Sequence, residues 1–169
     1  MTASLTTADM RNACAFLSSP ALIRLITEID DNGPIPPRRL AVTLPDLSAH
    51  HLRRTTDAAR AHGLVRVGPG VGLDLTTSGS ELADVYDAAA RWARRHAYPA
   101  PICDFTTRLQ HTLSLVAPAP LADPADDSHR STVEDLPEAD ADLAHIRDRL
   151  ALWLAANPQV TLSAPEPVA

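Results

Sequence analysis

The sequence predicts a mainly α-helical fold that carries one small β-hairpin and continues into additional C-terminal helices. Aromatic residues make up only 4% of the 169 residues, so alanine, leucine and valine must build the core, which favours helices. Apolar residues recur every three to four positions in several segments, which is the period of an α-helix. A glycine-rich turn at residues 68–72 separates two short strand-like runs.

The charge of the chain is unevenly distributed. The total is −6, but residues 1–112 carry twelve arginines against eleven acids, whereas residues 113–169 carry three against ten. Within residues 36–66, six arginines face two acids, a local excess of four positive charges. The acidity of the whole chain therefore does not exclude nucleic acid as a partner, because the positive charge is concentrated in one segment.

Two helical segments precede the basic region. Residues 8–31 should be helical with a break before Pro20, because proline is favoured in the first turn of a helix. A short helix should then run from Arg38 to Thr43 or Leu44. Helix starts favour acids, so Arg38 and Arg39 in its first turn are easier to explain if a phosphate backbone passes nearby. The residues predicted to point inward are Leu40, Ala41 and Leu44.

The next helix should span residues 48–62. Ser48 is a typical N-cap, Leu47 and Leu52 have the spacing of a hydrophobic staple, and Gly63 is a typical helix terminator. One face holds the apolar or small residues Leu52, Thr56 and Ala59. The residues predicted to lie on the opposite face are Ala49, His50, Arg53, Arg54 and Asp57. Two helices joined by so short a connection predict a helix-turn-helix.

A hairpin should follow, with strands at 64–67 and 73–76. After a recognition helix, such a hairpin is the wing of a winged helix-turn-helix. A long helix should then begin between Thr76 and Ser78, where Ser78 and Glu81 fit the capping-box pattern, and end near His96. Its predicted buried residues are Leu82, Val85, Tyr86, Ala89 and Trp92.

The C-terminal part predicts two more helices. The first covers about 101–117 and has an apolar stripe that consists of Ile102, Phe105, Leu109, Leu113 and Val116. Residues 118–137 predict an acidic, proline-rich linker. A helix over 138–156 then presents a stripe too apolar to stand alone, Leu143, Ile146, Leu150, Trp153 and Leu154. Residues 157–169 are predicted to be a frayed tail.

Residues 10–97 resemble the HxlR group of bacterial winged-helix transcriptional regulators, relatives of the MarR family. The segments that carry the resemblance are Gly33-Pro34, Pro37-Arg38-Arg39-Leu40, Leu44-Pro45-Asp46-Leu47-Ser48, Leu52, His62-Gly63-Leu64-Val65, Leu75-Thr76-Thr77-Ser78-Gly79 and Trp92-Ala93-Arg94-Arg95-His96. The resemblance implies a DNA-binding domain over residues 1–97. It also implies a homodimer that binds a pseudo-palindromic site in double-stranded DNA.

The resemblance assigns roles to individual residues of this chain. The candidates for reading bases from the second helix of the motif are Ala49, His50, Arg53 and Arg54, and Ser48 is a further candidate for DNA binding. Arg38 and Arg39 would contact phosphates from the first helix of the motif, and Arg66 would lie on the wing. The chain departs from the group at Thr56, where a large aliphatic residue is usual, and at its short uncharged wing. Residues 98–169 have no counterpart in the group.

Other residues admit more than one interpretation. Cys14 and Cys103 are either buried structural thiols or redox-sensitive ones, and the apolar neighbours of Cys14 favour burial. The adjacent histidines His50 and His51 diverge by about 100° on a helix, which argues against a shared metal; one should face DNA and the other should be partly packed. The aromatic residues that could contact a small-molecule effector or a second copy, or could simply build the core, are Tyr86, Trp92, Phe105 and Trp153.

The sequence favours a DNA-binding regulator over an enzyme. It contains no phosphate-binding loop, no metal-spaced cluster and no recognisable nucleophile with its base, so neither catalysis nor a cofactor is expected. No signal peptide or membrane-length apolar run is recognisable, so a cytoplasmic protein without membrane contact is expected. A protein-interaction module on a winged-helix scaffold, with little or no DNA binding, is the alternative, because fold does not fix function.

Overall fold

The computed structural model describes residues 6–118 and 137–162. The prediction of a mainly helical fold with one small hairpin is confirmed. The elements, in chain order, are α1 (Thr7–Leu17), α2 (Pro20–Asn32), a 3-10 turn (Pro37–Arg39), α3 (Leu40–Thr43), α4 (Ala49–Ala61), β1 (Val65–Gly68), β2 (Gly72–Leu75), α5 (Thr77–Arg95), α6 (Phe105–Val116), α7 (Pro137–Ala156) and α8 (Pro158–Leu162). The break before Pro20 is where the sequence predicts it.

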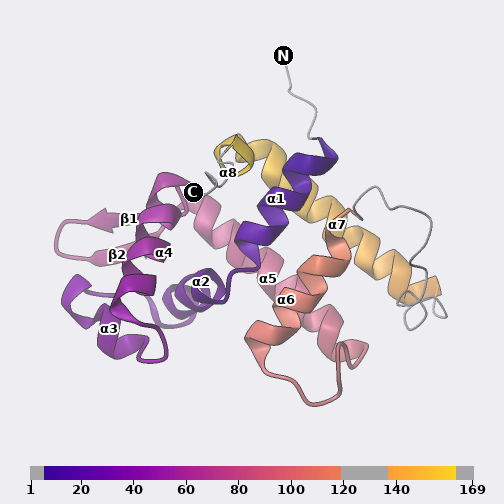
Figure 1. Cartoon of the computed structure of the whole chain (residues 1–169), viewed down its shortest axis with the longest axis horizontal. Coiled ribbons are helices and arrows are strands. Elements are labelled where there is room, and N and C mark those ends of the chain that lie inside the picture. Colours follow the sequence, from indigo (N-terminus) through magenta and orange to yellow (C-terminus); the bar gives the residue numbers. More distant parts are fainter. Residues whose placement is uncertain (1–5, 119–136, 163–169) are drawn as a thin grey trace, which may run out of the picture.

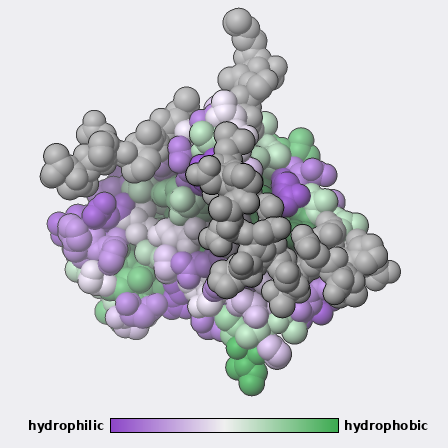
Figure 2. Space-filling model, turned by 45° about the vertical axis from the view of Figure 1, so that its right-hand side comes forward, coloured by the Kyte–Doolittle hydropathy of each residue, from purple (hydrophilic) through white to green (hydrophobic). Residues whose placement is uncertain are grey.

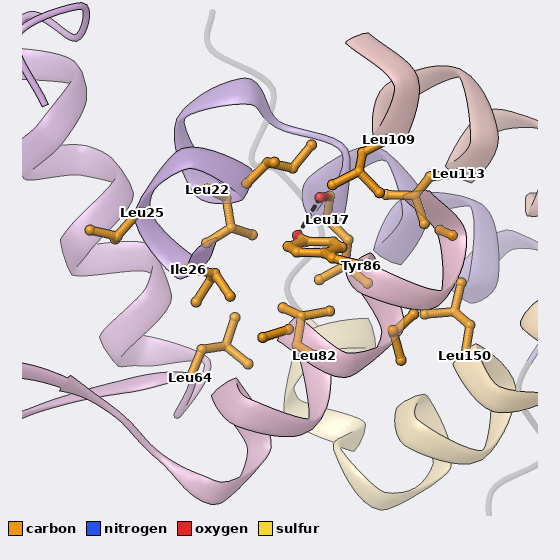
Figure 3. Close-up of a cluster of buried hydrophobic side chains, with 14 of the residues drawn as sticks. Leu17, Leu22, Leu25, Ile26, Leu64, Leu82, Tyr86, Leu109, Leu113 and Leu150 are labelled. Atoms are coloured by element: carbon orange, nitrogen blue, oxygen red, sulfur yellow. Dashed lines mark hydrogen bonds between the residues drawn. The ribbon is translucent and has the colours of Figure 1, made fainter. Parts of the chain in front are cut away.

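Helix α5 is the centre of the molecule. It runs between the α2–α4 and hairpin region on one side and helices α6 and α7 on the other (Figure 1). Tyr86 of α5 is fully buried, and its hydroxyl donates a hydrogen bond of 2.6 Å to the carbonyl of Leu17 (Figure 3). The predicted inward face of α5 is confirmed, since Leu82, Val85, Tyr86, Ala89 and Trp92 are all buried. Each large apolar side chain so buried stabilises the fold by about 1.5–3 kcal/mol.

The hairpin has a third backbone partner that local sequence patterns do not predict. Ile35, in the segment between α2 and α3, exchanges two backbone hydrogen bonds with Leu73 of β2, at 2.9 and 2.8 Å. Gly72 makes this approach possible. Its φ is +101°, and a Cβ at this position would lie 2.5 Å from the Ile35 carbonyl oxygen. The hairpin is therefore fixed to the segment that leads into α3.

Helix α5 begins at Thr77, within the predicted range, but its N-cap differs from the prediction. Thr76, not Ser78, is the N-cap, because its hydroxyl accepts from the Gly79 amide at 3.1 Å while the backbone carbonyls of Gly63 and Leu64 accept from that hydroxyl. The capping box predicted for Ser78 and Glu81 is therefore wrong. Thr76 follows directly after β2, so the end of the hairpin determines where the helix begins.

The start of α6 also differs. The helix begins at Phe105, capped by Asp104, whose carboxylate accepts from the Thr107 amide at 3.0 Å. Ile102 was expected in the apolar stripe of this helix, but its side chain is 95% exposed, so that prediction is wrong. The prolines of residues 97–104 keep this segment out of the helix. Leu109, Leu113 and Val116 are buried as expected, and Phe105 is half-buried.

The C-terminal helices pack on the body of the molecule. All five residues of the predicted α7 stripe are buried against α5 and α6. Residues 157–162 are not frayed, which corrects the prediction: α8 packs against α1, and Asn157 is only 2% exposed. The predicted acidic linker and the last seven residues lie outside the described residues, apart from Pro118 and Pro137. No helix in the described part of the chain is both long and apolar enough to cross a membrane.

Few large apolar residues reach the surface. On the face shown in Figure 2, hydrophobic residues occur as separate spots among hydrophilic ones rather than as one continuous patch. Within the described residues, the exposed large apolar side chains are those of Val42, Val67, Val71, Ile102 and Leu152.

Candidate nucleic-acid interface

Local sequence determines both ends of α4. The Ser48 hydroxyl accepts a hydrogen bond from the His51 amide at 3.2 Å, which confirms Ser48 as the N-cap. The helix ends before Gly63, whose φ of +69° is the left-handed conformation expected of a helix terminator. Leu52 and Ala59 are buried, as predicted for the inner face. The N-cap, the terminating glycine and the helical period therefore determine which residues of α4 are exposed.

The predicted outer face of α4 is exposed. Ala49, His50, Arg53 and Arg54 all lie at the surface. Successive helical residues are rotated by about 100°, so Arg54 lies nearly opposite the buried Leu52, whereas Arg53 lies on the flank that faces α3. His51 is exposed as well, so the expectation that one of the two histidines is partly packed is wrong.

The arginines of α4 and of the turn before α3 have no side-chain partner in the described part of the chain. Within residues 6–118 and 137–162, none of five exposed arginine side chains forms an ion pair or a side-chain hydrogen bond. They are Arg38, Arg39, Arg53, Arg54 and Arg60. Their guanidinium groups remain available to a ligand, and guanidinium suits phosphate and the edge of guanine in particular.

Two neighbouring arginines differ because they are paired with acids. Arg24 of α2 contacts Asp46 at 3.1 Å, which ties α2 to the α3–α4 connection. Arg66 of β1 contacts Asp74 of β2 at 3.5 Å, and the two residues are directly opposite in the hairpin register. An exposed pair of this kind contributes only about 0–1 kcal/mol, so a phosphate could compete for Arg66. The pairing nevertheless removes net positive charge from the hairpin.

A shallow groove of about 310 Å³ separates α3 from α4. Arg53 and Asp57 stand on its α4 side, and Leu40 and Ala41 on its α3 side. Ala41 is exposed, so its predicted inward position is wrong, whereas Leu44 is fully buried and Leu40 is half-buried. Thr56 also lines this groove. Its hydroxyl is buried without a hydrogen-bond partner among the described residues, so Thr56 is a weak point of the core.

The far end of α4 is held by a contact that no sequence pattern indicated. His62 is buried, and its Nδ1 lies 3.0 Å from the backbone carbonyl oxygen of Gln159 in α8. The Gln159 side chain donates in return to the His62 carbonyl at 3.1 Å. The ring of Phe16 in α1 lies 4.5 Å from the His62 ring. No short-range signal could have revealed this contact, because its partners are far apart in sequence.

The remaining candidates lie away from α4. Cys14 is buried, and burial raises the pKa of its thiol to about 11, which disfavours the reactive thiolate; Cys103 is half-buried. Tyr86 and Trp92 belong to the core, whereas Trp153 lines a second groove, between α5 and α7. No group of three or more His, Cys, Asp or Glu side chains in the described ranges could hold a metal ion.

Comparison with known proteins gives no match: no protein-family model, no curated protein and no solved structure matches the chain. Evidence for function therefore comes from the residues of this chain alone.

Proposed function

We propose that the protein is a sequence-specific DNA-binding transcriptional regulator that acts as a homodimer, with α2 to β2 serving as a winged helix-turn-helix. One observation carries the proposal: five exposed arginines on α4 and the turn before α3 lack any acidic partner among the described residues. A polyanion would neutralise them.

The element order supports this proposal. The motif consists of a short helix, a tight connection and a capped second helix, followed by a hairpin. Ile35 pairs with Leu73 of this hairpin. In such a motif the second helix enters the major groove and its N-terminal residues reach the bases. In this proposal those residues are Ala49, His50, Arg53 and Arg54, and Arg38 and Arg39 would contact phosphates.

A mobility-shift assay tests the proposal. The probe is duplex DNA from the region around the encoding gene, with a random duplex as competitor. The double variant Arg53→Ala/Arg54→Ala should lose binding while its circular dichroism spectrum and unfolding curve stay unchanged. The matched control is Arg91→Ala/Arg94→Ala, which removes two exposed arginines from α5 and should bind as the wild type does. Equal affinity of both double variants would contradict the assignment.

Salt dependence gives a second measurement. If arginines on α4 and the preceding turn neutralise phosphates, the logarithm of the association constant should fall linearly with the logarithm of the salt concentration. Each phosphate contact should contribute about −0.9 to the slope of this line. Binding insensitive to salt would contradict phosphate recognition.

A protein-interaction module is the second candidate function. It is favoured by the exposed Val42 of α3, which is 74% accessible, and by the pairing of Arg66 with Asp74 in the hairpin. If neither the intact chain nor a chain truncated after residue 117 binds DNA in the same assay, this function becomes the better explanation. Tighter DNA binding by the truncated chain would instead indicate that the acidic C-terminal region competes with DNA.

A further inference from the structure

The groove between α5 and α7 is a second surface with apolar and charged residues together. It has a volume of about 310 Å³ and is lined by Val85 of α5 and by Leu152 and Trp153 of α7. Glu81 and Asp84 stand on its α5 side and Arg149 on its α7 side. None of these residues belongs to α3, α4 or the hairpin, so the surface is distinct from the candidate nucleic-acid interface.

Leu152 is the apolar residue that this surface leaves uncovered. The buried stripe of α7 faces the body of the protein, but Leu152 lies outside that stripe and is 73% exposed. Burial of a leucine side chain is favourable, so the exposed Leu152, which lines the groove beside the buried Trp153 and Val85, offers a partner an apolar contact.

The groove has charged residues on both sides. In the described part of the chain, no ion pair or side-chain hydrogen bond involves Glu81, Asp84 or Arg149. The two helices are antiparallel, because the Trp153 indole donates to the Ser78 carbonyl at 3.0 Å while Arg95 contacts Asp142 at 2.7 Å. The groove therefore has negative charge along one side and positive charge along the other.

We propose that this groove is the contact surface between two copies of the chain. A two-fold axis parallel to the groove would lay α7 of each copy over α5 of the other. Arg149 of each copy would then face the acidic side of the other, and the two Leu152 side chains would enter the apolar centre. The inference deepens the homodimer part of the proposed function and does not depend on DNA binding.

The distribution of charge favours a second copy over another partner. A basic partner would pair with Glu81 and Asp84 but would bring like charge against Arg149, and an acidic partner would do the reverse. Like charges in contact oppose association, whereas a self-complementary surface pairs both sides at once.

The first test measures mass in solution. Size-exclusion chromatography with light scattering should give twice the chain mass for the wild-type protein without DNA. Leu152→Asp should raise the dimer dissociation constant by at least about 30-fold, because it removes an apolar contact and adds like charge on both copies. Ile102→Asp changes an even more exposed apolar residue on the α5–α6 loop and should leave the dimer intact.

A charge-swap experiment tests the register. Arg149→Glu should be monomeric alone, because the introduced carboxylate would face the acidic side of the other copy. Glu81→Arg/Asp84→Arg should also be monomeric alone, because Arg149 would then face the introduced guanidinium groups. An equimolar mixture of the two variants should restore the dimer, since the contact between a reversed basic side and a reversed acidic side again pairs opposite charges. A purely structural effect of either variant would not be reversed by mixing.

The outcomes separate this inference from the proposed function. A monomeric wild-type protein overturns both the groove and the homodimer. A wild-type dimer that survives Leu152→Asp, or variants that fail to associate on mixing, overturns the groove and leaves another homodimer surface open. Loss of DNA binding in Arg53→Ala/Arg54→Ala is measured separately and does not bear on either result.

Discussion

His62 and Gln159 hydrogen-bond to each other in both directions across 97 residues of sequence. His62 caps the C-terminal end of α4, and Gln159 lies in α8, which packs on α1. The last described helix therefore holds the end of the helix that the proposed function places in the major groove. The C-terminal region, which has no counterpart in the resembled family, thus belongs structurally to the same unit as α4.

Removal of this contact should lower stability. Gln159→Ala deletes the donor to the His62 carbonyl and should reduce the free energy of unfolding by about 1 kcal/mol. His62→Ala also removes a buried ring that contacts Phe16 and should cost more, about 2–3 kcal/mol. Urea unfolding followed by circular dichroism measures both losses.

Thr161→Ala is a matched control for the α8 variants. Its exposed hydroxyl bonds only to the Pro158 carbonyl within the same helix, at 2.8 Å. Its effect should stay within about 0.5 kcal/mol. The double variant His62→Ala/Gln159→Ala should be less destabilised than the sum of the single variants, because both lose part of one contact. Strict additivity would argue against a shared contact.

The sequence predicted the parts of the fold that local rules determine. Ser48, Leu52 and Gly63 gave the correct start, inner face and end of α4, because capping and helical period act over a few residues. Period alone failed at Ile102, where prolines exclude the residue from the helix whose apolar spacing it matches. It also failed at Ala41, because α3 is too short to establish a clear inner face.

Long-range contacts set the limit of what the sequence could predict. Nothing near Ile35 signals that it pairs with Leu73, and nothing near His62 signals Gln159. Thr76 and Ser78 are both good caps by residue type, and only the position of the hairpin end selects Thr76. For the candidate site, exposure of Arg53 and Arg54 followed from helical period, but the pairing of Arg66 depended on the hairpin register.

Arg108 should be important for stability although it is charged and buried. Its guanidinium donates to the carbonyls of Ala93, Tyr98, Pro101 and Cys103, at distances of 2.9–3.4 Å. Arg108→Ala would leave these carbonyls without that donor and should lower the free energy of unfolding by about 3 kcal/mol. Arg108→Lys keeps the charge but not the planar guanidinium, so its free energy of unfolding should lie between those of the wild type and Arg108→Ala. The exposed Arg91→Ala serves as control, and an equally small loss at Arg108 would contradict its structural role.

Asp30 should make stability depend on pH. Partial burial, followed by the charges of Asp31, Asp87 and Asp84, raises the pKa of its carboxyl above the ordinary value of 3.8. The unfolded chain then releases this proton more readily than the folded chain, so Asp30 disfavours folding as the pH rises through the folded-state pKa. Asp30→Asn should therefore be more stable than the wild type at neutral pH. The difference should vanish at low pH, where Asp30 is protonated in both states.

Asp148→Asn provides the comparison for Asp30, since it removes one exposed acid from α7. Its unfolding midpoint is measured against the wild type over the same pH range. A stability gain of Asp30→Asn that persists unchanged below the folded-state pKa would show that electrostatics is not the cause.

Cys14 should be unreactive while the protein is folded. Burial raises the pKa of its thiol to about 11, and only the thiolate attacks disulfide reagents. Thiol titration of the native protein at pH 8 should therefore show that Cys14 reacts only after addition of denaturant. Cys14→Ser identifies its contribution, because this variant should lose only the reaction that appears after addition of denaturant. Rapid reaction of Cys14 in the native protein would instead support a redox role.

Arg53 and Arg54 should contribute differently to DNA binding. Arg54 lies nearly opposite the buried face of α4, whereas Arg53 lines the groove between α4 and α3, which Pro37 of the preceding turn also lines. Arg54→Ala should therefore reduce discrimination between a preferred and a scrambled duplex, by about 1–3 kcal/mol. Arg53→Ala should weaken binding to both duplexes equally and reduce the salt slope by about one.

Selection from a duplex pool with a random core supplies the preferred sequence for this comparison. The wild type and both variants are then titrated with the preferred and the scrambled duplex at several salt concentrations. Arg91→Ala is the internal reference, because this exposed arginine lies on α5, outside the motif. If Arg53→Ala rather than Arg54→Ala abolishes discrimination, α4 is rotated in the groove so that its α3-facing flank reads the bases.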